Sequence, residues 1–135
     1  MQARSVFALA ALAGLTLATT PVMAHHSFAA EYDPNKPVTV TGTVTKLEWT
    51  NPHARFYIDA KDESGKVLNW EFELGSPNGL MRKGWTRSSL KPGDTITVDG
   101  YAAKDGSHLV NARSVSLADG RKIFAGAAED GGPTK

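Results

Sequence analysis

The stretch from Val38 to His53 constrains the fold of this chain more than any other. Its first eight residues alternate valine or glycine with threonine, which is the period of two expected of a β-strand with one apolar face. The phase slips after Val44, because the next apolar residues are Leu47 and Trp49. Such a slip turns the apolar side chains outward unless a β-bulge absorbs it. We therefore predict one long strand, from Val38 to about Trp49, that bends midway and serves two halves of a small barrel.

Further strands are predicted on both sides of a short helix. His53–Ala60 and Val67–Leu74 alternate strictly and flank a polar turn, which indicates an antiparallel hairpin with one wet face. Ser76 and Pro77 are a typical N-cap and first residue of a helix. The later strands are expected at Thr95–Tyr101, at about His108–Leu117 with a bulge between Ala112 and Val115, and at Ile123–Phe124.

Three strands, a short helix and two more strands form the pattern of an OB-fold. We predict an all-β fold with one short helix, a small OB-fold-like antiparallel barrel of order β-β-β-α-β-β. The alternative is a small open sheet or sandwich of the same strands. One shared core is expected to contain Phe56, Ile58, Leu68, Trp70, Phe72, Ile96 and Val98.

The N-terminal residues are typical of a secretory signal peptide. Arg4 precedes an apolar run, and small residues before His25 suit a signal peptidase. We expect a signal peptide over residues 1–24, an irregular N-terminal arm over 25–37, the barrel over 38–124 and a disordered tail over 125–135. The mature protein is then periplasmic or secreted and is not embedded in a membrane.

Charge and cysteine content narrow the class of function. Of 15 Lys and Arg residues only Arg4 lies in the predicted signal peptide, which leaves 14 against 14 Asp and Glu. A neutral domain argues against binding to nucleic acid by charge. The chain has no cysteine, so it has neither a disulfide nor a thiolate for catalysis or metal binding. An exported protein without disulfides suits a bacterial periplasm.

Several motifs together resemble a family of small exported bacterial proteins of unknown function. They are the His25-His26-Ser27-Phe28 start, Asn51-Pro52-His53, Trp70-Glu71-Phe72-Glu73 and Lys104-Asp105-Gly106-Ser107. The resemblance covers essentially the whole mature chain and implies no established activity. By strand order alone the barrel is also similar to periplasmic bacterial OB-fold proteins.

The four histidines are candidate metal ligands. Cleavage before His25 would give that residue a free α-amino group beside its imidazole, and a second imidazole would complete a three-nitrogen site of the kind that copper favours. His26 is adjacent, and either His53 or His108 could supply the barrel ligand. A straight strand would hold His53 up to ~40 Å from the arm, at about 3.3 Å per residue, but curvature shortens this distance. The alternative is that all four are solvated or hydrogen-bonded residues without a metal.

The wet face of the predicted hairpin is the second candidate site. Its residues are Arg55, Tyr57, Asp59, Asn69, Glu71 and Glu73. OB-folds bind ligands across this face, but three carboxylates suit a cation, a saccharide or a protein segment better than a nucleic acid. A salt-bridged wet face without a ligand is the alternative.

We find no sequence motif that indicates catalysis. Glu71 and Glu73 share a face, but nothing in the sequence indicates that they are buried, and no catalytic triad or phosphate-binding loop is apparent. We therefore expect a binding module and not an enzyme. The first hypothesis is a divalent metal ion, copper or else zinc, held by the N-terminal histidine and a barrel histidine. The alternative is a metal-free module that binds a protein or saccharide on the hairpin face.

Overall fold

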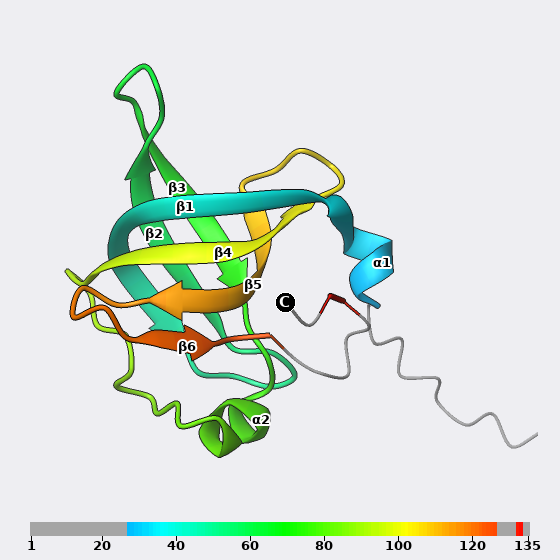
Figure 1. Ribbon diagram of the computed structural model, residues 1–135, viewed down its shortest axis with the longest axis vertical. Helices are drawn as coiled ribbons and strands as arrows, with labels where there is room; N and C mark the ends of the chain where they lie inside the picture. The colour runs from blue at the N-terminus through cyan, green and yellow to red at the C-terminus, as the bar shows by residue number, and fades with distance from the viewer. Residues whose placement is uncertain (1–26, 127–131, 134–135) are drawn as a thin grey trace, which may run out of the picture.

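The long strand β1 (Tyr32–Glu48) organises the structure, a computed structural model that describes residues 27–126 and 132–133. Its first part pairs antiparallel with β4 (Thr95–Ala103), and its second part pairs antiparallel with β2 (Arg55–Lys61). The sheet continues through β3 (Val67–Glu73) on one side and through β5 (Leu109–Ser116) and β6 (Lys122–Phe124) on the other. A parallel pairing between β3 and β5 closes the ring (Figure 1). The predicted all-β, barrel-like fold is confirmed.

The predicted bend in the first strand is a β-bulge. The register between β1 and β2 shifts between Val44 and Lys46, where the apolar phase slips in the sequence. Gly42 lies just before this shift, and a Cβ atom there would be 2.3 Å from the carbonyl oxygen of Asp59. Only glycine permits this close approach of two strands. The bulge therefore keeps the apolar side chains of both halves of β1 on the inside.

The second predicted bulge lies at Arg113. Asp99 pairs with Ser114 and Gly100 pairs with Ala112, so Arg113 is the extra residue on β5. This bulge lies inside the interval in which the sequence predicts it. It leaves Arg113 on the outer face of the barrel, where the rings of Phe28 and Tyr101 lie within 4.9 and 5.9 Å of its guanidinium group.

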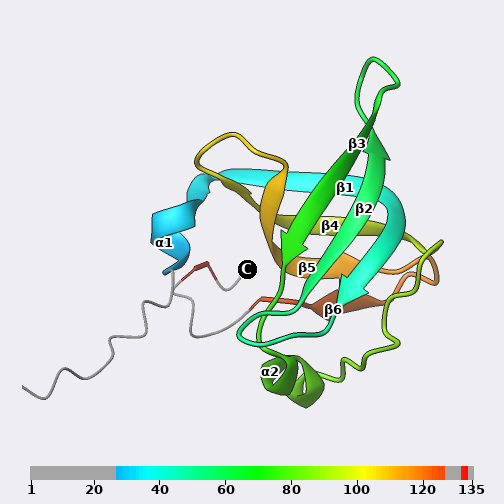
Figure 2. The same cartoon turned by 180° about the vertical axis from the view of Figure 1, so that it is seen from behind.

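The core is the one that strand alternation predicts, with two exceptions. Phe56, Ile58 and Phe72 are fully buried. In β4, Val98 is fully buried and Ile96 is about 2% exposed. Leu68 and Trp70, predicted to share this core, are only half-buried. Figure 2 shows that the β2–β3 hairpin projects beyond the barrel. β3 pairs with β5 only over Glu71, Phe72 and Glu73, so Leu68 and Trp70 precede the part of β3 that closes the barrel.

A short helix closes one end of the barrel, as predicted. In α2 (Pro77–Arg82), the side chain of the N-cap residue Ser76 accepts a hydrogen bond from the Gly79 amide at 3.1 Å. Leu80 and the following Trp85 are both about 1% exposed and pack into the core. The indole Nε1 of Trp85 donates to the Phe124 carbonyl at 2.8 Å, which ties this segment to β6.

The prediction of an irregular N-terminal arm is wrong for residues 28–37. A second short helix, α1 (Phe28–Glu31), leads directly into β1, which begins six residues before Val38. Phe28 and Tyr32 are buried with Ala103 in a second apolar cluster on the outside of the barrel. This cluster stabilises a segment whose own sequence shows no helical or strand periodicity.

Both ends of the chain include residues that the structure does not describe. The predicted signal peptide, residues 1–24, lies outside the described residues, as do His25, His26 and most of the tail. Ala125 was expected to be disordered, but it is fully buried and its amide donates to the Arg113 carbonyl at 2.9 Å. Within the described part of the chain, no helix is long and apolar enough to span a membrane.

Candidate functional site

His53 lies just before β2 with its imidazole held in a defined orientation. Its Nδ1 atom is 3.0 Å from the Leu74 carbonyl oxygen. A carbonyl can only accept, so Nδ1 carries the proton and the lone pair of the neutral ring is on Nε2. A backbone carbonyl that fixes the tautomer in this way is a common partner of metal-binding histidines. The His53 ring is therefore oriented as a ligand through Nε2.

Glu73 at the end of β3 is a buried carboxylate beside this histidine. It is only 8% exposed, and burial raises its pKa, whereas the nearby charges of His53 and Arg55 lower it. The Glu73 Oε2 atom is 3.5 Å from the Arg55 guanidinium. The sequence shows no cause for this burial, to which the buried Tyr32 at the start of β1 contributes, because Tyr32 and Glu73 act on each other's pKa. The expectation that nothing buries this carboxylate is therefore wrong for Glu73.

Tyr32 at the start of β1 belongs to the same cluster. It is 1% exposed, and burial, followed by the neighbouring charges of Glu73 and Glu31, raises the pKa of its phenol. The N-terminal segment and the β2–β3 hairpin thus meet at Glu73. The curvature of the barrel brings His53 and the start of β1 to a single carboxylate, although β1 separates them in sequence.

The other predicted barrel histidine has a different environment. The His108 ring packs on Trp70, with ring centroids 4.7 Å apart and planes tilted by 37°. Its carbonyl oxygen accepts a hydrogen bond from the Glu71 amide at 2.9 Å. Among residues 27–126 and 132–133, no group of three or more His, Cys, Asp or Glu side chains is placed to hold a metal ion.

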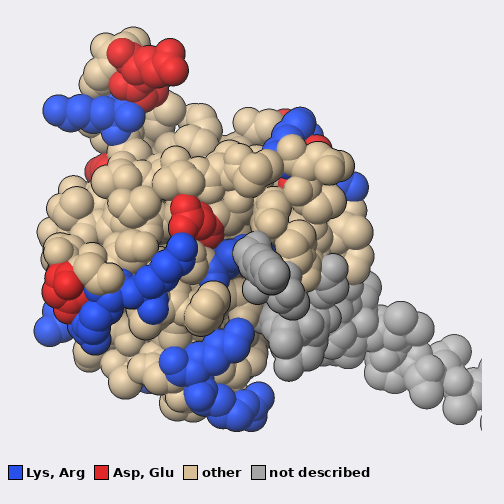
Figure 3. Space-filling view, in the orientation of Figure 1, with Lys and Arg blue, Asp and Glu red and all other residues tan. Residues whose placement is uncertain are grey.

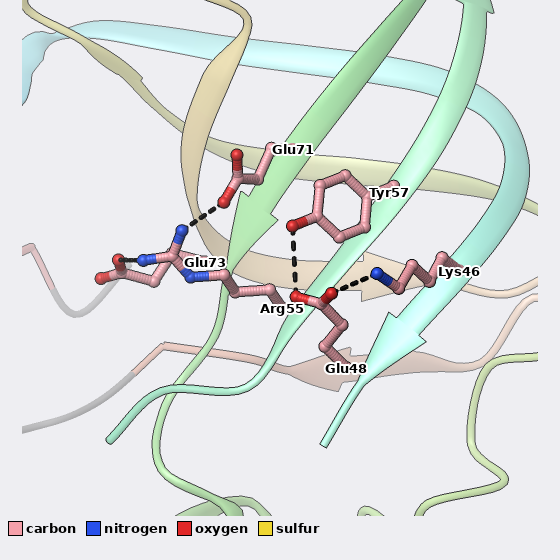
Figure 4. A network of polar contacts seen from close by, with 6 residues as sticks. All are labelled: Lys46, Glu48, Arg55, Tyr57, Glu71 and Glu73. Carbon is pink, nitrogen blue, oxygen red and sulfur yellow. Dashed lines mark hydrogen bonds and ion pairs between the residues drawn. The ribbon is translucent and has the colours of Figure 1, made fainter. Parts of the chain in front are cut away.

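The outer face of β2 and β3 carries a network of paired charges (Figure 4). The Arg55 guanidinium forms ion pairs with Glu71 and Glu73, and the Tyr57 hydroxyl donates to Glu48 at 3.2 Å. The hydrogen bond from Lys46 is the main reason that the pKa of the exposed Glu48 is lowered. At the outer end of this face, the Asn69 amide donates to the Asp59 carboxylate at 2.8 Å.

The predicted hairpin residues are thus brought together on one face, and their charged groups pair mainly with one another. Lys46, Glu48 and Tyr32 were not among the predicted site residues. The wet side of β1 could have indicated the first two, because Lys46 and Glu48 lie next to β2 once the bulge is taken into account. Nothing local in the sequence connects Tyr32 with Glu73.

These features define a small β-barrel with an N-terminal segment packed on its outer face. A model of a protein family matches residues 12–111, and that family is described as "Family of unknown function (DUF6152)". The chain therefore belongs to this uncharacterised family. A comparison with curated proteins finds no match.

Proposed function

We propose that this protein is an exported, non-enzymatic binding module for a divalent metal ion, with copper favoured over zinc. The barrel ligand is His53, and the other ligands come from His25 and His26 at the mature N-terminus. The observation that carries this proposal is the fixed orientation of the His53 imidazole, whose Nδ1 atom lies 3.0 Å from the Leu74 carbonyl oxygen, so that Nε2 is the ligand atom.

The barrel geometry shortens the path between the proposed ligands. The charges of Glu31, the last residue of α1, and of His53 both act on the pKa of Glu73. His26 directly precedes Ser27, the N-cap residue of α1. Only a short segment therefore separates the proposed N-terminal ligands from the cluster that contains His53.

The chemistry of this cluster suits a cation. An N-terminal histidine offers its amine and a ring nitrogen, and one further imidazole gives three nitrogen ligands, a set that copper prefers. Nδ1 of His53 donates a hydrogen bond to the Leu74 carbonyl oxygen, and no described residue forms a hydrogen bond with Nε2. His108 is the weaker candidate because its ring packs on Trp70.

Copper competition titrations test the proposal. We would measure Cu(II) affinity for the protein that begins at His25, for the same protein with its α-amino group acetylated, and for His53→Ala and His108→Ala. We expect acetylation and His53→Ala each to weaken binding at least tenfold, because each removes a nitrogen ligand. His108→Ala is the matched control and should leave the affinity unchanged.

The same experiment separates the two classes of function. Equal affinities for the mature and acetylated proteins would exclude the N-terminal site. A metal-free module that binds a protein or saccharide on the β2–β3 face would then be the better explanation. Mass spectrometry of the exported protein tests the assumption on which the site depends, which is cleavage immediately before His25.

A further inference from the structure

A large groove lies on the opposite side of the molecule from the β2–β3 face. It has a volume of about 980 Å³ and lies over the outer faces of β1, β4, β5 and β6. Its apolar surface comes from Pro133 and from side chains of several strands, namely Pro37, Val38, Tyr101, Ile123 and Phe124. Phe124 is 64% exposed, which makes it one of the few large apolar side chains that the barrel leaves in water. This volume is within the range of small-molecule sites.

The charged groups of the groove are mainly cationic. Lys83, Arg113 and Lys122 line it, together with the single carboxylate of Asp99. Asp99 is engaged by Thr39 at 2.8 Å, by Lys122 at 3.1 Å and by Ser114 at 3.2 Å. Figure 3 shows Lys and Arg side chains gathered over the part of this face that β6 and α2 occupy. The charge of the groove therefore favours an anionic ligand.

The backbone of the groove offers little to a peptide. β1 pairs with β4, β4 with β5, and β5 with β6, so the main-chain groups of the lining strands are largely used within the sheet. The carbonyl of Phe124 on the outer strand accepts from the Trp85 indole. An extended peptide that adds to a sheet needs main-chain partners. A ligand that binds through an apolar chain and one charged end needs none.

We propose that the groove binds a single-chain anionic amphiphile, of which a long-chain fatty acid is the reference. The acyl chain lies against Phe124, Ile123 and Tyr101, and the carboxylate lies at Lys83. The Lys83 ammonium donates one hydrogen bond, to the neutral Gly126 carbonyl, and an ammonium group has three donors. Lys122 stands at the start of β6 and adds positive charge, although Asp99 already pairs with it.

Displacement of a fluorescent fatty-acid analogue from the mature protein tests this site. We expect saturable binding of oleate, and affinity that rises about three- to fourfold for each buried methylene in a series of shorter saturated acids. Oleyl alcohol should bind at least tenfold more weakly than oleate, because it lacks the charge that Lys83 recognises. Equal binding of the acid and the alcohol would overturn the assignment of Lys83.

Matched variants locate the site. Phe124→Ser and Lys83→Glu should each weaken oleate binding about tenfold or more. Two variants of the distant β2–β3 hairpin serve as controls. Val67→Ser removes an apolar side chain that is 53% exposed, and Lys66→Glu reverses the neighbouring charge. These two controls should bind oleate as the unaltered protein does. Equal losses in controls and groove variants would refute the groove as the site.

Vesicles distinguish a free amphiphile from a membrane surface. The protein should not sediment with vesicles of phosphatidylcholine and phosphatidylglycerol, because the groove receives one chain and not a lipid surface. Sedimentation that Phe124→Ser abolishes, without saturable binding of oleate, would replace the proposal with a membrane-docking face. Absence of binding to both probes would overturn it entirely.

Discussion

Truncation of Phe72 should destabilise the barrel more than truncation of Trp70, although tryptophan is the larger residue. Phe72 is 0% exposed and stacks on Phe56 with ring centroids 4.9 Å apart and planes 8° from parallel. Phe72→Ala should therefore lower the free energy of unfolding by about 3–5 kcal/mol, through lost burial and the cavity left behind. Trp70 is half-buried where the hairpin leaves the barrel, so Trp70→Ala should cost about 1–2 kcal/mol.

Urea unfolding followed by far-ultraviolet circular dichroism measures both effects, because that signal does not depend on the deleted indole. The two residues lie on the same strand and face, so each substitution serves as the control for the other. A small domain is stable by about 5–15 kcal/mol, and the loss in Phe72→Ala should be clear as a lower midpoint at an unchanged slope. A loss in Trp70→Ala equal to or larger than that in Phe72→Ala would contradict this description of the core.

Two further predictions concern the bend of β1 and a carboxylate of the groove. Gly42→Ala should lower the free energy of unfolding by about 1–3 kcal/mol, because its Cβ would lie 2.3 Å from the Asp59 carbonyl oxygen. Urea unfolding measures this loss, and a midpoint equal to that of the unaltered protein would show that the strands do not approach so closely. The hydrogen bond from Thr39, followed by that from Lys122, lowers the pKa of Asp99 in the folded protein. The ionised carboxylate of Asp99 therefore stabilises the fold fully above its unfolded pKa of about 3.9, and this stabilisation is lost as the pH falls through the lower folded pKa. Asp99→Asn should therefore destabilise the protein at pH 7 and have progressively less effect as the pH falls below about 4. A difference in thermal midpoint between the variant and the unaltered protein that stays constant across this pH range would refute the explanation.

Local features of the sequence were sufficient to predict the barrel and both of its bulges. A phase slip of apolar residues after Val44 and another after Ala112 are visible in the sequence, because a bulge must restore the side on which each side chain lies. Alternation also identifies which side chains of a strand face inward. It does not show how far along the strand the barrel extends, which is why Trp70 was placed in the core and proves half-buried.

The candidate sites depended on contacts that no local pattern encodes. Glu73 interacts with Tyr32 and His53, which come from the start of β1 and the segment before β2, and these segments lie far apart in the sequence. Alternation predicts only that Glu73 lies on the outer face, and an outer face is normally wet. The six predicted hairpin residues share one face because they are opposite one another across a single antiparallel pairing, in the pairs Arg55 and Glu73, Tyr57 and Glu71, and Asp59 and Asn69.

The bulge at Arg113 connects the two proposed sites physically. The extra residue turns the Arg113 side chain outward, where it contacts the rings of Phe28 and Tyr101 and lines the groove. Phe28 belongs to α1, the segment that also leads to Tyr32 and the cluster around Glu73. A cation held against two rings gives α1 a defined position at little cost in desolvation, because the aromatic faces replace part of its hydration. One irregularity in β5 therefore positions both the N-terminal segment proposed to carry metal ligands and one wall of the groove proposed to bind an anionic amphiphile.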